Sequence, residues 1–311
     1  MNKTFTAVER EKHGAELRSA WTDEPPVSTD VVPADAAARS NVPTQNLHTQ
    51  TGAGRKHGWG SRLRSYFIFN PLIWAYTIVL GTISLVCSFF DRDGRIQHKL
   101  ASFWSWLVMK TILSPVTMTG KTAGLAADAG GKARVFAVTH ASALDIPMLY
   151  VYLPFQFRIV FKSELLHYPF VGWHLRRSGQ VCINQQNPSA SIGAIKSALK
   201  SLRKGMPLVI FPEGGRTRDG QLQPFLPGAF FLAIKAQAEI VPIALVGTFD
   251  LLPMNTYHIK SQPLEMRVGE PVATAGLTLA DTETVSARVK AAIEDLHRAG
   301  VPSGAEAPIA L

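Results

Sequence analysis

The sequence has few of the residues that build disulfide frameworks or cysteine-based metal sites. Its 311 residues include two cysteines, Cys87 and Cys182, which stand far apart in apolar surroundings. Two isolated cysteines exclude a disulfide scaffold and a cysteine zinc site, and they suit a reducing compartment. The sequence also lacks a G-x-S-x-G elbow, which argues against an α/β-type serine hydrolase.

Basic and aromatic residues are not interleaved in the way that stacks on nucleic-acid bases. The net charge is +9 at pH 7, and the first 50 residues contribute nothing to this excess. A basic excess beside apolar segments favours anionic lipid headgroups. We therefore expect membrane lipids as partners and no nucleic acid.

The first 55 residues contain no sustained apolar run. They are rich in Ala, Thr, Asp, Pro and Gln, a composition that predicts a disordered tail at residues 1–55. The first apolar run begins too late for a cleavable signal peptide.

One later apolar run is long enough to cross a bilayer. Residues 66–90 are 25 consecutive positions without a charge, and about 20 suffice to span the hydrocarbon. Pro71 is expected to kink its first turns. A second run, 100–109, is too short to span and carries two tryptophans suited to the interface. We expect residues 56–120 to form a membrane-anchoring helical hairpin sunk into one leaflet. A single pass is the alternative. Basic residues lie on both sides of the apolar run, so the positive-inside rule assigns no orientation.

After about residue 130, short β-branched or aromatic runs alternate with helical patterns. The strand candidates lie at 133–138, 157–161, 180–184, 207–211, 240–247 and 264–269. Asn187 and Pro188 predict a helix start, and "TLAD" at 278–281 predicts a capping box. Residues 121–311 are therefore predicted to be an α/β domain with a mixed, largely parallel sheet flanked by helices, preceded by the N-terminal membrane-associated hairpin. Functional groups then belong at the carboxyl ends of the strands.

Two polar clusters follow predicted strands. "HASALD" places His140 and Asp145 after the first strand, and "FPEGGR" places Glu213 and Arg216 after the fourth. A His and an Asp five apart are common by chance, and so is a glycine-rich turn with solvated charges. The pair would require a loop or a helix start, because positions five apart lie about 140° apart on a helix. Together the clusters offer a base with a carboxylate and an arginine suited to phosphate.

These stretches resemble motifs of the glycerolipid acyltransferases. "HASALD" is similar to the family's H-x4-D motif and "FPEGGR" to its F-P-E-G-x-R motif. Between them, "FKSELLHYPFVGWHLRRSGQVCIN" resembles the K-x-E-L … P-x-x-G-W … G segment, and "IVPIAL" resembles the proline-centred fourth motif. The resemblance covers residues 66–275 and is specific, because four elements occur in the right order.

The resemblance implies an enzyme of phospholipid biosynthesis. It would move a fatty acyl group from a thioester donor, acyl-CoA or acyl carrier protein, to the sn-2 hydroxyl of lysophosphatidic acid, giving phosphatidic acid. No metal and no further cofactor are implied, and the protein is expected at the membrane with its active site facing the cytoplasm.

The resemblance also assigns roles to residues. His140 would be the general base, and Asp145 would hold its tautomer. Backbone N–H groups in the turn after His140 would stabilise the developing oxyanion. Ser142 and Cys182 are expected to be structural rather than nucleophilic. The residues assigned to substrate binding are Lys162, Glu213, Gly214 and Arg216, with Lys162 and Arg216 on the acceptor's phosphate.

The sequence departs from the family pattern at the second motif. Asn184 and Gln185 stand where an Asp and an Arg are usual. Two amides thus replace two charges, which leaves the acceptor headgroup open. The alternatives are an acyltransferase for another lysolipid and a non-catalytic lipid-binding protein of the same fold.

Overall fold

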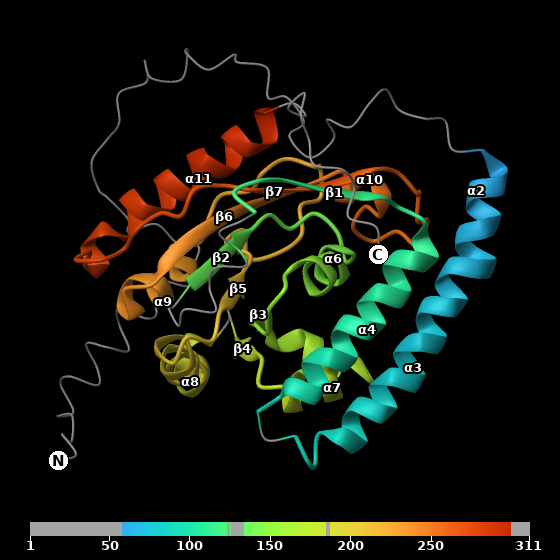
Figure 1. The fold of residues 1–311 in the computed structure, drawn as a ribbon, viewed down its shortest axis with the longest axis horizontal. Helices are drawn as coiled ribbons and strands as arrows, with labels where there is room; N and C mark the ends of the chain where they lie inside the picture. Colours follow the sequence, from blue (N-terminus) through green and yellow to red (C-terminus); the bar gives the residue numbers. More distant parts are fainter. Residues whose placement is uncertain (1–57, 92, 123–124, 126–133, 185–186, 300–311) are drawn as a thin grey trace.

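The structure, a computed structural model, describes residues 58–91, 93–122, 125, 134–184 and 187–299 (Figure 1). The predicted tail at 1–55 and Gln185 lie outside the described residues. The N-terminal helical segments are α2 (Trp59–Arg64), η3 (Ser65–Phe69), α3 (Asn70–Cys87) and α4 (Arg95–Ile112). The later helices are α6 (Asp145–Tyr152), η5 (Ser163–His167), α7 (Val171–Arg177), η6 (Pro188–Ser191), α8 (Ile192–Arg203), α9 (Gly228–Ala236), α10 (Thr248–Leu251), η7 (Leu279–Asp281) and α11 (Thr282–Arg298).

Seven strands form one mixed, largely parallel sheet, as the sequence predicts. They are β1 (Val116–Gly120), β2 (Arg134–Val138), β3 (Arg158–Lys162), β4 (Val181–Ile183), β5 (Leu208–Ile210), β6 (Glu239–Val246) and β7 (Leu264–Val268). Their order is β1-β7-β6-β2-β5-β3-β4, and the β6–β7 pair alone is antiparallel. Strands β2, β5, β3 and β4 are therefore neighbours that point the same way, so their carboxyl ends meet at one edge.

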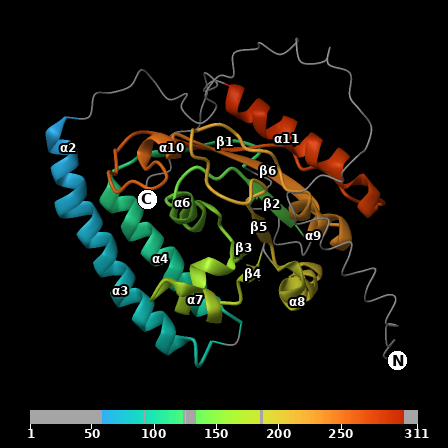
Figure 2. The same ribbon diagram turned by 180° about the vertical axis from the view of Figure 1, so that it is seen from behind.

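Helices cover the two faces of this sheet in separate groups (Figures 1 and 2). One core lies between the sheet and α4 and α6, and includes Phe136, Met148 and Ile112. The other lies between the sheet and α8, α9 and α11, and includes Leu202, Phe230 and Ile293. The predicted capping box is present, since Thr278 and Asp281 bond reciprocally ahead of α11.

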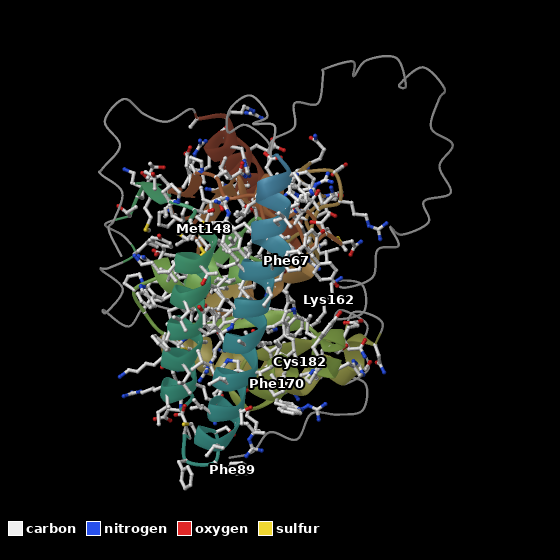
Figure 3. The ribbon with its side chains drawn as sticks, turned by 90° about the vertical axis from the view of Figure 1, so that its right-hand side faces the viewer. Phe67, Phe89, Met148, Lys162, Phe170 and Cys182 are labelled. Atoms are coloured by element: carbon white, nitrogen blue, oxygen red, sulfur yellow. The ribbon has the colours of Figure 1, made fainter. Side chains whose placement is uncertain are left out.

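The predicted helical hairpin is present as α3 and α4, which pack side by side (Figures 1 and 2). The helical run Trp59–Cys87 is long and apolar enough to cross a membrane, and 17% of its most apolar window is buried in the protein. Figure 3 shows Phe67 and Phe89 toward opposite ends of this arm. Its exposed apolar side makes it unlike a helix of a protein core.

Pro71 stands in the first turn of α3, directly after the π-helical turn η3, and the Asn70 side chain donates to the Ser65 carbonyl at 2.8 Å. Two local expectations need correction. Pro188 opens a 3₁₀ turn before α8 rather than α8 itself. Strand β1 lies inside the predicted anchoring segment 56–120, yet it pairs with β7. Its sequence, VTMTG, alternates over only four residues before Gly120, which is too short a pattern to mark a strand by itself.

Helix α4, the second helix of the hairpin, is packed against the α/β domain more closely than expected. The face of α4 that carries Val108, Met109 and Ile112 is buried in the core of the α/β domain. Its interfacial residue Trp106 is 37% exposed. Helix α4 therefore joins the apolar arm to the domain.

Candidate active site

His140 and Asp145 face each other at the carboxyl end of β2. His140 lies in the loop after that strand, and Asp145 is the first residue of α6, the helix start that a pair at this spacing requires. The His140 Nδ1 lies 2.8 Å from the Asp145 Oδ2. Asp145 is fully buried, whereas the imidazole is 16% exposed. With the carboxylate accepting the Nδ1–H, the Nε2 atom is left as the proton acceptor of the ring.

The backbone of this turn is committed to holding Asp145. The N–H groups of Ala141 and Ser142 both donate to Asp145 Oδ2 at 2.8 Å, and the N–H of His140 donates to Glu213. The expectation that these N–H groups bind an oxyanion is therefore wrong for residues 140–142. They stabilise the carboxylate that orients the base instead.

Glu213 holds the main chain of His140 from the other side. Its Oε1 accepts the His140 N–H at 2.8 Å, and its Oε2 accepts the Gln223 N–H at 2.9 Å. The N–H of Thr217 donates to the His140 carbonyl at 3.0 Å. The loop after β5 thus clamps both polar groups of the His140 peptide. Burial raises the pKa of Glu213 to about 7, against the opposing effect of these two N–H donors.

One aromatic contact was not foreseen. The ring of Phe211, the residue after β5, stacks on His140 with centroids 4.1 Å apart and planes 22° apart. The stacking fixes the imidazole plane that the bond to Asp145 leaves free to tilt. Phe211 is the first residue of the "FPEGGR" stretch. Its place in the same motif as Glu213 is the feature of the sequence that could have pointed to it.

Lys162 ends β3 and reaches the glycine loop after β5. A Cβ placed on Gly215 would lie 3.5 Å from the Lys162 Nζ, and Gly214 has φ +68°, a backbone region that favours glycine. Lys162 is exposed and Arg216 is half-buried. The structure therefore brings Lys162 next to the loop that carries Arg216.

Arg177, in the stretch between the two polar clusters, binds the apolar helical run instead of the candidate site. It donates to the Ser88 hydroxyl at 2.6 Å and lies over the Phe89 ring. It joins α7 to the end of the apolar arm.

The other polar residues singled out in the sequence are Ser142, Cys182 and Asn184. The Ser142 hydroxyl is buried and donates to the Leu252 carbonyl at 3.0 Å. Burial raises the pKa of the Cys182 thiol, which disfavours a nucleophilic thiolate. The Asn184 Oδ1 accepts the Asn187 N–H at 3.0 Å, a turn that an aspartate in the same place would also form.

Metal-ligating side chains do not gather in the described part of the chain. Across the described ranges, no three His, Cys, Asp or Glu side chains lie close enough to hold an ion.

The segment that carries this site matches a known protein family. The family model described as Acyltransferase matches residues 116–246, a range that contains His140, Asp145, Lys162 and Glu213. The candidate site therefore lies within the segment that is similar to this family.

The chain is also similar in sequence to individual curated proteins. The chain is 34% identical over 203 residues to the chloroplastic 1-acyl-sn-glycerol-3-phosphate acyltransferase LPAT1 of Arabidopsis thaliana, which covers 64% of this chain and 56% of that protein. It is 32% identical over 166 residues to the human 1-acyl-sn-glycerol-3-phosphate acyltransferase beta, and this match covers 53% of this chain and 57% of that protein. The match thus spans somewhat more than half the length of these relatives.

A solved structure shares the fold. The crystal structure of the 1-acyl-sn-glycerophosphate (LPA) acyltransferase PlsC from Thermotoga maritima superposes with a TM-score of 0.61 at 22% identity. The similarity covers 76% of this chain and 93% of that one.

Proposed function

We propose that this protein transfers a fatty acyl group from a thioester donor to the sn-2 hydroxyl of lysophosphatidic acid, giving phosphatidic acid. One observation carries the proposal: the 2.8 Å contact between His140 and the fully buried Asp145, at the sheet edge where Lys162 meets the glycine loop. The names of the curated relatives, 1-acyl-sn-glycerol-3-phosphate acyltransferases, support this choice of substrate.

The chemistry needs one positioned base. The acceptor hydroxyl is a weak nucleophile, and His140 Nε2 takes its proton as the oxygen attacks the thioester carbonyl. The C–S bond then breaks, and the imidazolium returns the proton to the leaving thiolate. Asp145 stabilises the imidazolium between these steps. The proposal requires no acyl-enzyme, metal or redox cofactor, and the donor is a co-substrate.

The acceptor's phosphate is assigned to the cations at the same edge. Lys162 and Arg216 provide charged donors, and charge-assisted bonds to phosphate are roughly twice as strong as neutral ones. A different lysolipid remains the second candidate, because the sequence has Gln185 where the family has an arginine.

We also propose that the protein lies in one leaflet, with its active site facing the cytoplasm. The Ser65 hydroxyl donates to the Tyr257 carbonyl at 2.9 Å, and Arg158 donates to the Asp93 carbonyl at 2.7 Å, just beyond the arm's other end. Both ends of the apolar arm are therefore bonded to one domain, which favours an arm lying along it over one that leaves it to span. The two free cysteines suit the reducing side of the membrane.

The test is an acceptor panel. Purified protein in lipid vesicles is given labelled acyl-CoA or acyl carrier protein and, in turn, lysophosphatidic acid, lysophosphatidylcholine and lysophosphatidylethanolamine. We expect labelled phosphatidic acid as the main product. Acylation of another lysolipid in preference would support the second candidate. Lipid binding without acylation of any acceptor would overturn the enzyme proposal in favour of a binding protein.

A further inference from the structure

The charged side chains of helix α8 are all positive. Lys196, Lys200, Arg203 and the C-capping Lys204 are all exposed, and we refer to these four residues as the α8 cationic stripe. Lys200, Arg203 and Lys204 follow Lys196 by four, seven and eight positions, which keeps all four on one side of the helix. No aspartate or glutamate occurs anywhere between Glu164 and Glu213. The stripe is therefore a row of like charges without acids from its own segment.

Helix α11 shows how a solvated helix face in the same protein is arranged. There Glu294 pairs with Arg298 at 3.2 Å and with Lys290 at 4.0 Å, so that both signs alternate. Among the described residues, no ion pair involves any member of the α8 cationic stripe. Cations near a helix C-terminus are favoured by the helix dipole, but this effect fades beyond the last turn and does not extend to Lys196. The four cations of the stripe therefore repel one another, whereas the charges on α11 are paired with opposite charges.

The position of α8 excludes the bilayer as the natural partner. Helix α8 packs on the sheet face that also carries α9 and α11, whereas α4 packs on the opposite face, with the apolar arm α3 outside it (Figures 1 and 2). A bilayer that holds the exposed side of α3 would lie away from α8. The partner of the stripe is therefore expected from the aqueous side.

The stripe is also connected to the candidate active site. Helix α8 begins at Ile192, soon after β4 ends at Ile183, and β4 ends at the sheet edge where Lys162 and His140 lie. Twelve residues of helix extend about 18 Å from that edge. A partner bound along α8 would reach the site with a flexible arm.

We propose that the α8 cationic stripe docks an acidic acyl carrier protein, the donor form in which the thioester is attached to a protein. This proposal rests on the acyl transfer proposed above. The four charges extend over about 12 Å of exposed helix, a length that fits a row of carboxylates on a partner helix. Complementary charges of this kind speed the encounter and select the partner.

The test compares two donors that carry the same acyl group. Rates with palmitoyl-acyl carrier protein and with palmitoyl-CoA are measured for wild type, Lys196→Glu and Lys200→Glu in the same vesicles. We expect each substitution to lower kcat/KM for the carrier-protein donor about tenfold, with an effect that shrinks as salt rises. The rate with palmitoyl-CoA should change less than twofold.

Arg288→Glu provides the matched control. Arg288 is an exposed cation of α11, so its replacement makes the same change of charge on the same sheet face. It should leave both donors unaffected. Equal losses with both donors, a loss with palmitoyl-CoA alone, or release from vesicles would overturn the docking proposal.

The outcome for wild type separates this inference from the function itself. Phosphatidic acid formed from palmitoyl-CoA but not from the carrier-protein donor would overturn the docking proposal and leave the acyl transfer standing. Absence of product from either donor would overturn the proposed function.

Discussion

His140 is held from three sides before any substrate binds. Asp145 bonds its ring, Phe211 stacks on its plane, and the loop with Glu213 and Thr217 fixes its peptide. A base positioned in this way loses little orientation freedom when the reaction starts. The carboxylate of Glu213 therefore acts on the site through the main chain of His140.

Glu213 should give the protein a measurable dependence of stability on pH. Burial raises its pKa from 4.5 to about 7, so the folded protein binds a proton that the unfolded chain has lost. The resulting stabilisation is complete below about pH 4.5 and is lost as the pH rises through 7. Glu213→Gln should remove this slope. Melting temperatures of wild type and variant, measured from pH 5 to 8, should lie closest at low pH, where Glu213 is neutral like Gln, and separate as the pH rises through 7; parallel curves would contradict the assignment.

Lys162→Ala and Arg216→Ala should weaken use of the acceptor. Each removes a charge-assisted contact worth about 1.5–3 kcal/mol, so kcat/KM for lysophosphatidic acid should fall by roughly 10- to 100-fold. Kinetics at varied lysophosphatidic acid check this, with Arg288→Ala as the control of equal charge. Unchanged kcat/KM in both variants would remove the phosphate site from this edge.

Strands and motifs could be read from the sequence because their signals are local. The β-branched runs marked six of the seven strands, and the motif order brought His140 and Asp145 into one hypothesis. The partners of Glu213 could not be read, because residues 140, 213 and 223 meet only after β2 and β5 pair. The same holds for α4, whose buried and exposed sides depend on which helix packs against it.

The contact between α3 and α7 is another feature that no local pattern reveals. A Cβ on Gly81 would lie 2.8 Å from the Phe170 Cβ, so the two elements approach because residue 81 has no side chain. His174 adds a 2.7 Å hydrogen bond to the Ser84 hydroxyl. Figure 3 shows Phe170 on the same side of the molecule as α3. The arm is thereby tied to the segment that follows Lys162.

Gly81→Ala should loosen this contact. We expect overpacking to cost about 1–3 kcal/mol, against a gain in helix propensity of no more than about 1 kcal/mol. Gly193→Ala in α8 is the matched control, because nothing lies within 4 Å of its Cβ position. Thermal unfolding in detergent should show a lower melting temperature for Gly81→Ala and an equal or higher one for Gly193→Ala. The reverse order would contradict the packing described for α3.

For the molecule as a whole, the apolar arm and the α/β domain form one bonded unit. The arm's exposed residues include Trp74 and Ile78, 53% and 45% exposed. Exposed apolar side chains gathered on one helix mark a surface that contacts lipid or another protein. It is the side that we expect to face lipid.

Trp74→Glu and Ile78→Glu should each reduce membrane binding. A buried carboxylate is costly in the bilayer, so we expect roughly tenfold less protein to float with vesicles. Ala287→Glu, at an exposed position of α11, should not change the bound fraction. Full binding by both arm variants would contradict the proposed lipid-facing side.

The most direct test of the account is the rate of phosphatidic acid formation by His140→Ala. Labelled acyl donor and lysophosphatidic acid are supplied to wild type and variant in the same vesicles, and the melting temperature and bound fraction are measured alongside. A positioned base contributes about 10²–10⁴ to the rate, so the account predicts a loss of at least about 100-fold with folding and membrane binding unchanged. A folded, membrane-bound His140→Ala protein that forms phosphatidic acid at nearly the wild-type rate would contradict it.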